Sequence, residues 1–303
     1  MTGQGERMRR HEKFCLSALL LASPLFSDTI LASDASEAQA ETAALATEEE
    51  ASVSLITKKR PGEERAWYVP DFTWGDVNVN GLDWTGGSTR RGRGNYKDFW
   101  YVELEGGAGW EWGELYFFTD WENPGKGFDA DKAPDDSRWV IKPVLNVNVP
   151  NAEGVMKNVQ LHIQDYYLYG KTFLVNNLVL GLAYKYVSED FFMRPFVGIH
   201  YAHDTFNASQ WNGYMGGWVF NYDFRAFERK FSLSNWHEFE WDRAEDFQSE
   251  FGDGASWGLQ GALAGWWHID KHVTGGIQYR YSYHKLGSYG YLNGVIYTLK
   301  YNF

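Results

Sequence analysis

The chain has 303 residues, of which 18% are aromatic and 32 are glycine. That length fits one large β domain or two average domains. After the first 30 residues no stretch approaches the run of about 18 apolar residues that a membrane-spanning helix needs, which excludes helical membrane proteins. The formal net charge of -12 argues against nucleic acid as a partner, because phosphate backbones bind basic surfaces.

The first 40 residues predict an export signal. A basic segment precedes a short apolar run, Phe14 to Phe26, and an A-x-A cleavage site follows at Ala38-Gln39-Ala40. The basic residues are Arg7, Arg9, Arg10 and Lys13. Leu31-Ala32-Ser33 is a second candidate cleavage site, and an uncleaved amphipathic helix is the alternative reading. We therefore expect residues 1–40 to be a signal peptide.

The only cysteine, Cys15, lies inside this apolar run. Its removal with the signal peptide would leave no thiol, hence no disulfide and no cysteine-bound metal. Residues 41–66 are rich in Ala, Glu and Lys, which predicts a polar tail or linker in the periplasm. From Trp67 the composition becomes strongly aromatic, so the folded domain is expected over residues 67–303. No cofactor is expected.

The end of the chain alternates with a period of two. From Val273 to Tyr283 the odd positions are large, apolar or glycine, and the even positions are mostly polar or small. The same alternation runs over residues 257–269 and 295–303. A period of two predicts strands with one apolar and one polar face.

Twelve such segments can be counted. They cover residues 74–86, 96–107, 109–121, 137–149, 157–169, 174–188, 191–205, 211–223, 229–243, 255–269, 271–284 and 290–303. Many are longer than the usual globular strand, and lengths of about 9 to 11 residues suit a tilted strand that crosses a membrane. Short turns, such as Gly107-Ala108 and Asp270-Lys271, alternate with longer loops.

These features predict an all-β fold, a transmembrane antiparallel β-barrel of about 12 strands in the outer membrane of a Gram-negative bacterium. The barrel must be closed, because lipid cannot satisfy an open sheet edge, so the last strand should pair with the first. A large soluble β-sandwich or extracellular lectin is the alternative.

Several segments carry a resemblance to a known family. They are Tyr101–Gly107 ("YVELEGG"), Glu114–Asp120 ("ELYFFTD"), Trp211–Tyr214 ("WNGY"), Phe239–Trp241 ("FEW"), Arg280-Tyr281 and the final "GVIYTLKYNF". In this order they resemble the nucleoside-specific channel-forming (Tsx-like) proteins of the outer membrane. The resemblance covers about residues 70–303 and implies a narrow channel for passive uptake of nucleosides. Where the family has inward basic residues, this chain has Met215, Gly217 and Val219.

Strand parity predicts which side chains line the lumen, because neighbours of the lipid-facing apolar residues must point inward. The predicted lumen residues are Glu103, Glu105, Glu114, Tyr116, Phe118, Asp120, Lys142, Arg194, His200, Trp211, Trp236, Glu238, Glu240, Arg280 and Lys300. The aromatic members could stack on a heterocyclic base, and the polar members could bind ribose hydroxyls. Alternatively, the ionic members only fill and rigidify a small barrel.

Other chemistry is weakly indicated. Outer-membrane barrels can be enzymes such as lipid hydrolases or proteases, and Asp204, His200 and Glu240 are the candidate acid–base residues here. His200 and His203 are three apart and should lie on opposite faces of a strand, so no metal site is expected there. An acidic loop with Asp129, Asp131, Asp135 and Asp136 could bind calcium or remain a solvated loop.

The expected partners follow from the barrel. They are nucleosides or similar small neutral solutes, outer-membrane lipid and lipopolysaccharide, and the barrel-assembly machinery through Phe303. External loops could also serve a surface receptor or adhesin, which is the alternative function and could coexist with transport.

Overall fold

The structure is a computed structural model that describes residues 66–92, 96–126, 136–171, 173–205, 207, 209–248 and 254–303. Among these residues no helix has both the length and the apolar character needed to cross a bilayer. The expected signal peptide and all of the expected tail except Ala66 lie outside the described residues.

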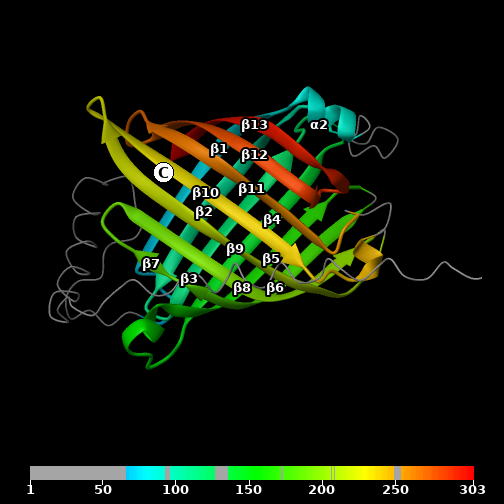
Figure 1. The fold of residues 1–303 in the computed structure, drawn as a ribbon. Coiled ribbons are helices and arrows are strands. Elements are labelled where there is room, and N and C mark those ends of the chain that lie inside the picture. The colour runs from blue at the N-terminus through cyan, green and yellow to red at the C-terminus, as the bar shows by residue number, and fades with distance from the viewer. Residues whose placement is uncertain are drawn as a thin grey trace, which may run out of the picture. The chain divides into compact units, whose positions relative to one another are not determined.

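Twelve long strands and one two-residue strand make up almost all of the described chain (Figure 1). The strands are β1 (Phe72–Trp84), β2 (Phe99–Trp110), β3 (Gly113–Glu122), β4 (Arg138–Asn148), β5 (Val159–Tyr169), β6 (Leu174–Tyr184), β7 (Tyr186–Val187), β8 (Phe191–Asp204), β9 (Ser209–Ala226), β10 (Arg229–Trp241), β11 (Trp257–His268), β12 (Val273–Lys285) and β13 (Ser288–Asn302). A short helix, α2 (Gly86–Arg91), and the 3-10 turns η2 (Gly154–Asn158) and η3 (Glu245–Phe247) complete the elements.

The strands form a closed antiparallel barrel, as the sequence predicts. Each long strand pairs with its sequence neighbours, and β7 continues the line of β6 along β8. The barrel closes where β1 pairs antiparallel with β13, from Asp76 opposite Asn302 to Trp84 opposite Gly294. Closure leaves no open edge for lipid to contact, which is the requirement for a sheet that spans a membrane.

The last residue is held in place by this closure. The amide of Phe303 donates to the carbonyl of Gly75 at 3.0 Å, and the amide of Asn302 donates to the carbonyl of His272 at 2.7 Å. A Cβ atom at Gly75 would lie 2.8 Å from the Phe303 ring, so the glycine leaves room for that ring. Figure 1 places this end of the chain and α2 at opposite ends of the strands.

The alternating pattern separates two faces. Apolar side chains on one parity are strongly exposed on the outside, for example Ile277, Tyr297 and Leu299 at 54 to 59%. Their neighbours on the other parity, such as Thr274, Ser282 and Thr298, are buried in the interior. An apolar outer face and a polar interior are the reverse of a soluble sandwich and match a membrane barrel.

One predicted turn is wrong. Gly107-Ala108 lies within β2, and the chain turns instead at Glu111-Trp112. The glycines of this strand make room for aromatic rings: a Cβ atom at Gly107 would lie 2.5 Å from Trp74 Nε1, and one at Gly109 would lie 2.1 Å from the Phe72 ring. The glycine pair therefore marks close packing across strands and not a change of direction.

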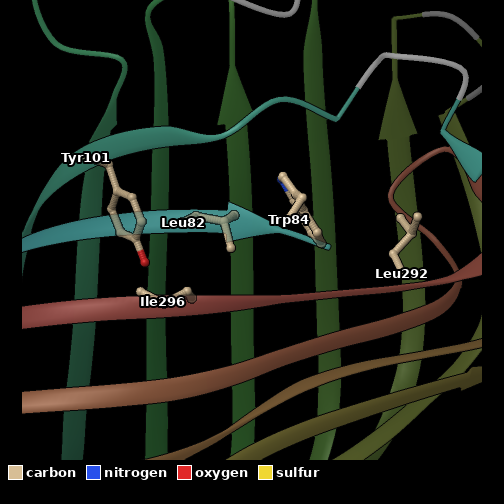
Figure 2. Close-up of a cluster of buried hydrophobic side chains, with 5 residues drawn as sticks. All are labelled: Leu82, Trp84, Tyr101, Leu292 and Ile296. Carbon is tan, nitrogen blue, oxygen red and sulfur yellow. The ribbon is translucent and has the colours of Figure 1, made fainter. Parts of the chain in front are cut away.

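A cluster of buried apolar side chains lies on the inner wall near α2 (Figure 2). It consists of Leu82 and Trp84 on β1, Tyr101 on β2, and Leu292 and Ile296 on β13. Helix α2 covers the edge of β13 beyond its last pair with β1, since Ser88 Oγ accepts from the Asn293 amide at 2.7 Å and donates to the Asn293 carbonyl at 2.8 Å. The helix thus satisfies strand groups that β1 no longer reaches.

Candidate functional site: the lumen of the barrel

Four carboxylates gather on the inner wall formed by β1, β2 and β3. We call Asp76, Glu103, Glu105 and Asp120 the acid patch. Strand register brings them together, because Asp76 lies opposite Glu105 and Glu103 lies opposite Asp120. Like charges directly opposite each other destabilise a sheet, so this arrangement needs compensation.

Lys300 on β13 supplies part of that compensation. Its Nζ lies 2.9 Å from Glu105 Oε2 and 3.2 Å from Asp76 Oδ2. Asn78 Nδ2 donates to Glu103 Oε1 at 2.9 Å. Asp120 Oδ1 is buried with no hydrogen-bond partner among the described residues. Glu105 keeps 18% of its side-chain surface exposed, so its oxygens offer acceptors that a solute's hydroxyl or amino groups could use.

Aromatic rings border the acid patch. Trp74 stacks on Tyr116 at 6.1 Å between centroids, and Tyr116 lies 6.3 Å from Phe118. The Tyr116 hydroxyl donates to Glu105 Oε1 at 2.7 Å, which fixes the ring beside a carboxylate. Trp266 on β11 lies under Lys300, with the Nζ atom 5.1 Å from the ring centroid. This wall thus offers flat π faces next to charged acceptors.

A second charged group joins β4 to β10. Lys142 Nζ lies 2.5 Å from Glu238 Oε1, and Gln260 Nε2 donates to Glu238 Oε2 at 2.8 Å. Trp236 lies between two cations, 5.8 Å from Lys142 Nζ and 4.6 Å from the Arg280 guanidinium carbon. Sequence parity placed Lys142, Trp236, Glu238 and Arg280 inside the barrel, and the structure brings them into one network.

The remaining predicted ionic residues form two further groups. Glu114 pairs with both Lys185 and Arg194. Glu240 pairs with Lys285 and with Arg243, whose Nη2 lies 2.6 Å away, and both side chains of the Arg243 pair are buried. Each carboxylate therefore has two cationic partners, which fixes it in a defined position.

The proposed acid–base residues are held by other contacts. His200 is fully buried and its Nε2 bonds Asn177 Oδ1 at 2.9 Å. Glu240 is held by its two cations, and Asp204 Oδ2 accepts from Asn207 Nδ2 at 2.8 Å. Each of these three side chains is therefore engaged in at least one polar contact within the barrel.

Trp211 is the one predicted lumen residue that points the other way. On β9 the step from Trp211 to Tyr214 is three residues, whereas the step opposite it on β8, from Tyr201 to Ile199, is two. Gly213, with φ of +72°, takes up the extra residue as a bulge and reverses the parity. Trp211 is 44% exposed on the outer face and packs edge-on against Tyr214, whereas Asn212 and Met215 point inward and are buried.

Sequence reasoning missed several inward residues. Asp76, Trp74 and the β1 and β13 members of the apolar cluster share the parity of Asn78 or of Thr298, so the period-two pattern contained the signal. Lys185 and Lys285 lie at strand ends, where parity is a weak guide. Of the acidic loop only Asp136 is described, and among the described residues no three His, Cys, Asp or Glu side chains are placed to hold a metal ion.

A closed antiparallel barrel with an apolar outer face and a charged, aromatic lumen defines an outer-membrane channel. The sequence profile of the family described as "Nucleoside-specific channel-forming protein, Tsx" matches residues 79–303. The chain belongs to this family, which makes it an outer-membrane channel for small solutes.

Solved structures to which the chain is similar include a NanC porin, at 10% identity over 74% of this chain and 98% of that chain, with a TM-score of 0.44. A bacterial polysaccharide outer-membrane secretin matches at 7% identity over 76% and 98%, with a TM-score of 0.35. The calcium-bound outer-membrane phospholipase dimer of Salmonella typhi matches at 10% identity over 78% and 94%, with a TM-score of 0.36.

Proposed function

We propose that the channel passes nucleosides, and that the wall carrying the acid patch is where they bind on the way through. The observation that carries this proposal is the juxtaposition of π faces with carboxylates, seen most directly where the Tyr116 hydroxyl donates to Glu105 beside the Trp74 ring. A nucleoside presents a flat heterocycle and a sugar with hydroxyl donors, so one solute can use both kinds of group at once.

The contacts suit a conducting site. Base stacking contributes on the order of 1–3 kcal/mol per base, and exposed carboxylate contacts to hydroxyls are individually modest. A channel must hold its solute weakly enough to release it. In this proposal Tyr116 and Phe118 supply ring faces, and Glu105 accepts from the sugar.

Charge on the solute should matter as well. A wall with four carboxylates and one lysine repels phosphate groups, so nucleosides should pass more readily than nucleotides. This preference comes from the residues of the wall themselves and adds to what family membership implies.

The test is permeation of purified protein in liposomes and planar bilayers. Swelling with adenosine or thymidine should exceed swelling with a sugar of equal size, and either nucleoside should reduce ionic conductance in a saturable way. Adenosine monophosphate should have a weaker effect. Equal swelling rates for nucleoside and sugar, together with no nucleoside block, would end the proposal.

We also propose the remaining partners from the exposed surfaces. The outer apolar face should contact membrane lipid and lipopolysaccharide. Phe303, 42% exposed at the closing strand, would be available to the barrel-assembly machinery. Removing Phe303 should slow insertion into the outer membrane in cells while leaving detergent refolding of purified protein largely intact; equal insertion rates would refute this role.

A further inference from the structure

The ion pair between Lys142 and Glu238 crosses the lumen. Lys142 lies on β4 and Glu238 on β10, and around the barrel at least four strands separate them in either direction. Their side chains nevertheless meet, with Nζ 2.5 Å from Oε1. Two side chains that reach each other from facing walls must occupy the space between those walls. We call this ion pair the crossbar.

The crossbar is fixed by further contacts. Gln164 on β5 donates to Glu238 Oε1 at 2.9 Å, and Gln260 on β11 donates to Oε2 at 2.8 Å. The two side chains of the pair are only 14% and 8% exposed. Charge-assisted bonds of this kind are about twice as strong as neutral ones, and a shielded pair is screened little by salt.

One side of the crossbar is filled with neutral side chains. His162, Gln164, Val179, His200 and Met215, on β5, β6, β8 and β9, are 0 to 3% exposed and form what we call the filled side. They form a continuous row, since Gln164 lies opposite Val179, and its Nε2 lies 3.7 Å from Met215 Sδ. Water does not reach this row at the height of the crossbar.

Part of the other side is exposed to water, although Asp76 in its wall is buried. This side is lined by inward residues of β1 to β3 and β11 to β13, and we call it the open side. Glu105 and Lys300 keep 18% and 16% of their side-chain surface exposed there, and Tyr116 and Phe118 are half-buried. Glu105, Lys300 and the two rings therefore give a solute that reaches the crossbar a water-exposed surface along which to continue.

We infer that the crossbar confines the solute path to the open side and sets the size limit of the channel. This inference rests on the channel function of the family and is independent of which solute is natural. It assigns Lys142 and Glu238 a specificity-determining role that acts through pore width. Removing either side chain should free the space between the two facing walls and widen the pore.

The first experiment measures pore size without nucleosides. Glu238→Ala and Lys142→Ala should raise unitary conductance at least about twofold, because conduction follows the width and lining of the narrowest section. Both should also raise the size limit in a series of neutral sugars. The charge-reversed pair K142E/E238K should return both values toward those of the natural chain.

The matched control is Glu122→Ala. Glu122 also faces the lumen and pairs with Arg138 at 2.6 Å, but the two residues lie opposite each other on adjacent strands, so their ion pair follows the wall. Glu122→Ala should leave the size limit for sugars unchanged. A shift in conductance equal to that of Glu238→Ala would show that loss of charge alone, and not loss of the crossbar, accounts for the effect.

A second measurement covers variants that fold poorly. Single cysteines replace Met215 on the filled side or Phe118 on the open side, in a chain with Cys15 replaced by Ser, and a water-soluble thiol reagent is added. Phe118→Cys should react in the natural background, whereas Met215→Cys should react only when Glu238→Ala is also present. Rapid reaction of Met215→Cys with the crossbar intact, or unchanged size limits in folded crossbar variants, would overturn the inference.

Discussion

At the height of the crossbar the two sides of the lumen differ sharply. The filled side is neutral and 0 to 3% exposed, whereas the open side carries the acid patch, Lys300 and half-buried rings. Both sides are built from the same alternating strand pattern. The difference arises from the inward residues: the side chains of the filled side pack together, whereas Glu105 and Lys300 on the open side keep part of their surface exposed.

This contrast shows how a small barrel can be both rigid and permeable. Small barrels are ordinarily filled by side chains, and a channel has to leave part of the interior unfilled. Here the filled side is closely packed, whereas Glu105 and Lys300 on the open side remain partly exposed. Substitutions on the filled side should therefore act on stability, and substitutions on the open side on permeation.

The largest expected effect is on stability. Met215→Ala removes a fully buried side chain from the filled side and should lower the free energy of unfolding by about 2–5 kcal/mol. Urea titration of protein refolded into liposomes measures this. Val219→Ala is the control, because Val219 is inward on the same strand but 38% exposed, and its loss should be below about 1 kcal/mol. Equal losses would show that the filled side is not a packed core.

The next effect is on solute affinity. Phe118→Ala removes a ring from the open side and should weaken nucleoside block by about 1–3 kcal/mol, the range for one stacked base. Phe196→Ala makes the same change on β8, where the ring stacks on His162 at 4.5 Å, and should leave the block constant unchanged. Titrating conductance with adenosine compares them. A loss of block in Phe196→Ala alone would reverse the assignment of the two sides.

A smaller effect concerns ion selectivity. Lys300→Gln removes the base that contacts Glu105 and Asp76, so the open side becomes more negative and the preference for potassium over chloride should rise a few-fold. The reversal potential in a salt gradient measures this preference, which should diminish at high ionic strength. His200→Gln, a neutral change on the filled side, should leave the reversal potential unchanged. An unaltered potential in Lys300→Gln would place the ion path elsewhere.

Much of this arrangement was predictable from the sequence. A period of two fixes which side chains point inward, so the twelve long strands, their closure and all but one of the fifteen predicted lumen orientations follow from local pattern. The one reversal, at Trp211, comes from a single added residue at Gly213. Asn-Gly is a sequence typical of turns, and inside a strand such a glycine indicates a bulge.

The two sides of the lumen were not predictable. Parity states that Lys142 and Glu238 face inward, but it does not state which strands face each other at which height. That depends on closure, on strand tilt and on side-chain length. The two members of the crossbar are 96 positions apart in the sequence, so no local pattern relates them. The same holds for the apolar cluster, which assembles from β1, β2 and β13 only after the ends of the sheet meet.

The smallest expected effect lies at the turn into β12, on the open side but beyond the strands. Asp270 Oδ1 accepts from the amides of His272 at 2.7 Å and Val273 at 2.9 Å, and these bonds hold the pKa of Asp270 below its ordinary value of 3.8. A folded-state pKa below the unfolded-state pKa means that the stabilisation is complete above the unfolded-state pKa and is lost as pH falls through the folded-state pKa.

Asp270→Asn should therefore remove the part of the pH dependence of stability that Asp270 contributes below about pH 4. At pH 7 the free energy of unfolding should change only by the small contribution of an exposed turn. Unfolding titrations at both pH values test this, and Lys271→Gln in the same turn should leave the acid limb as it is in the natural chain. If Asp270→Asn still loses stability below pH 4, the carboxylates of the lumen cause that loss. Its size would then give their contribution to the free energy of unfolding.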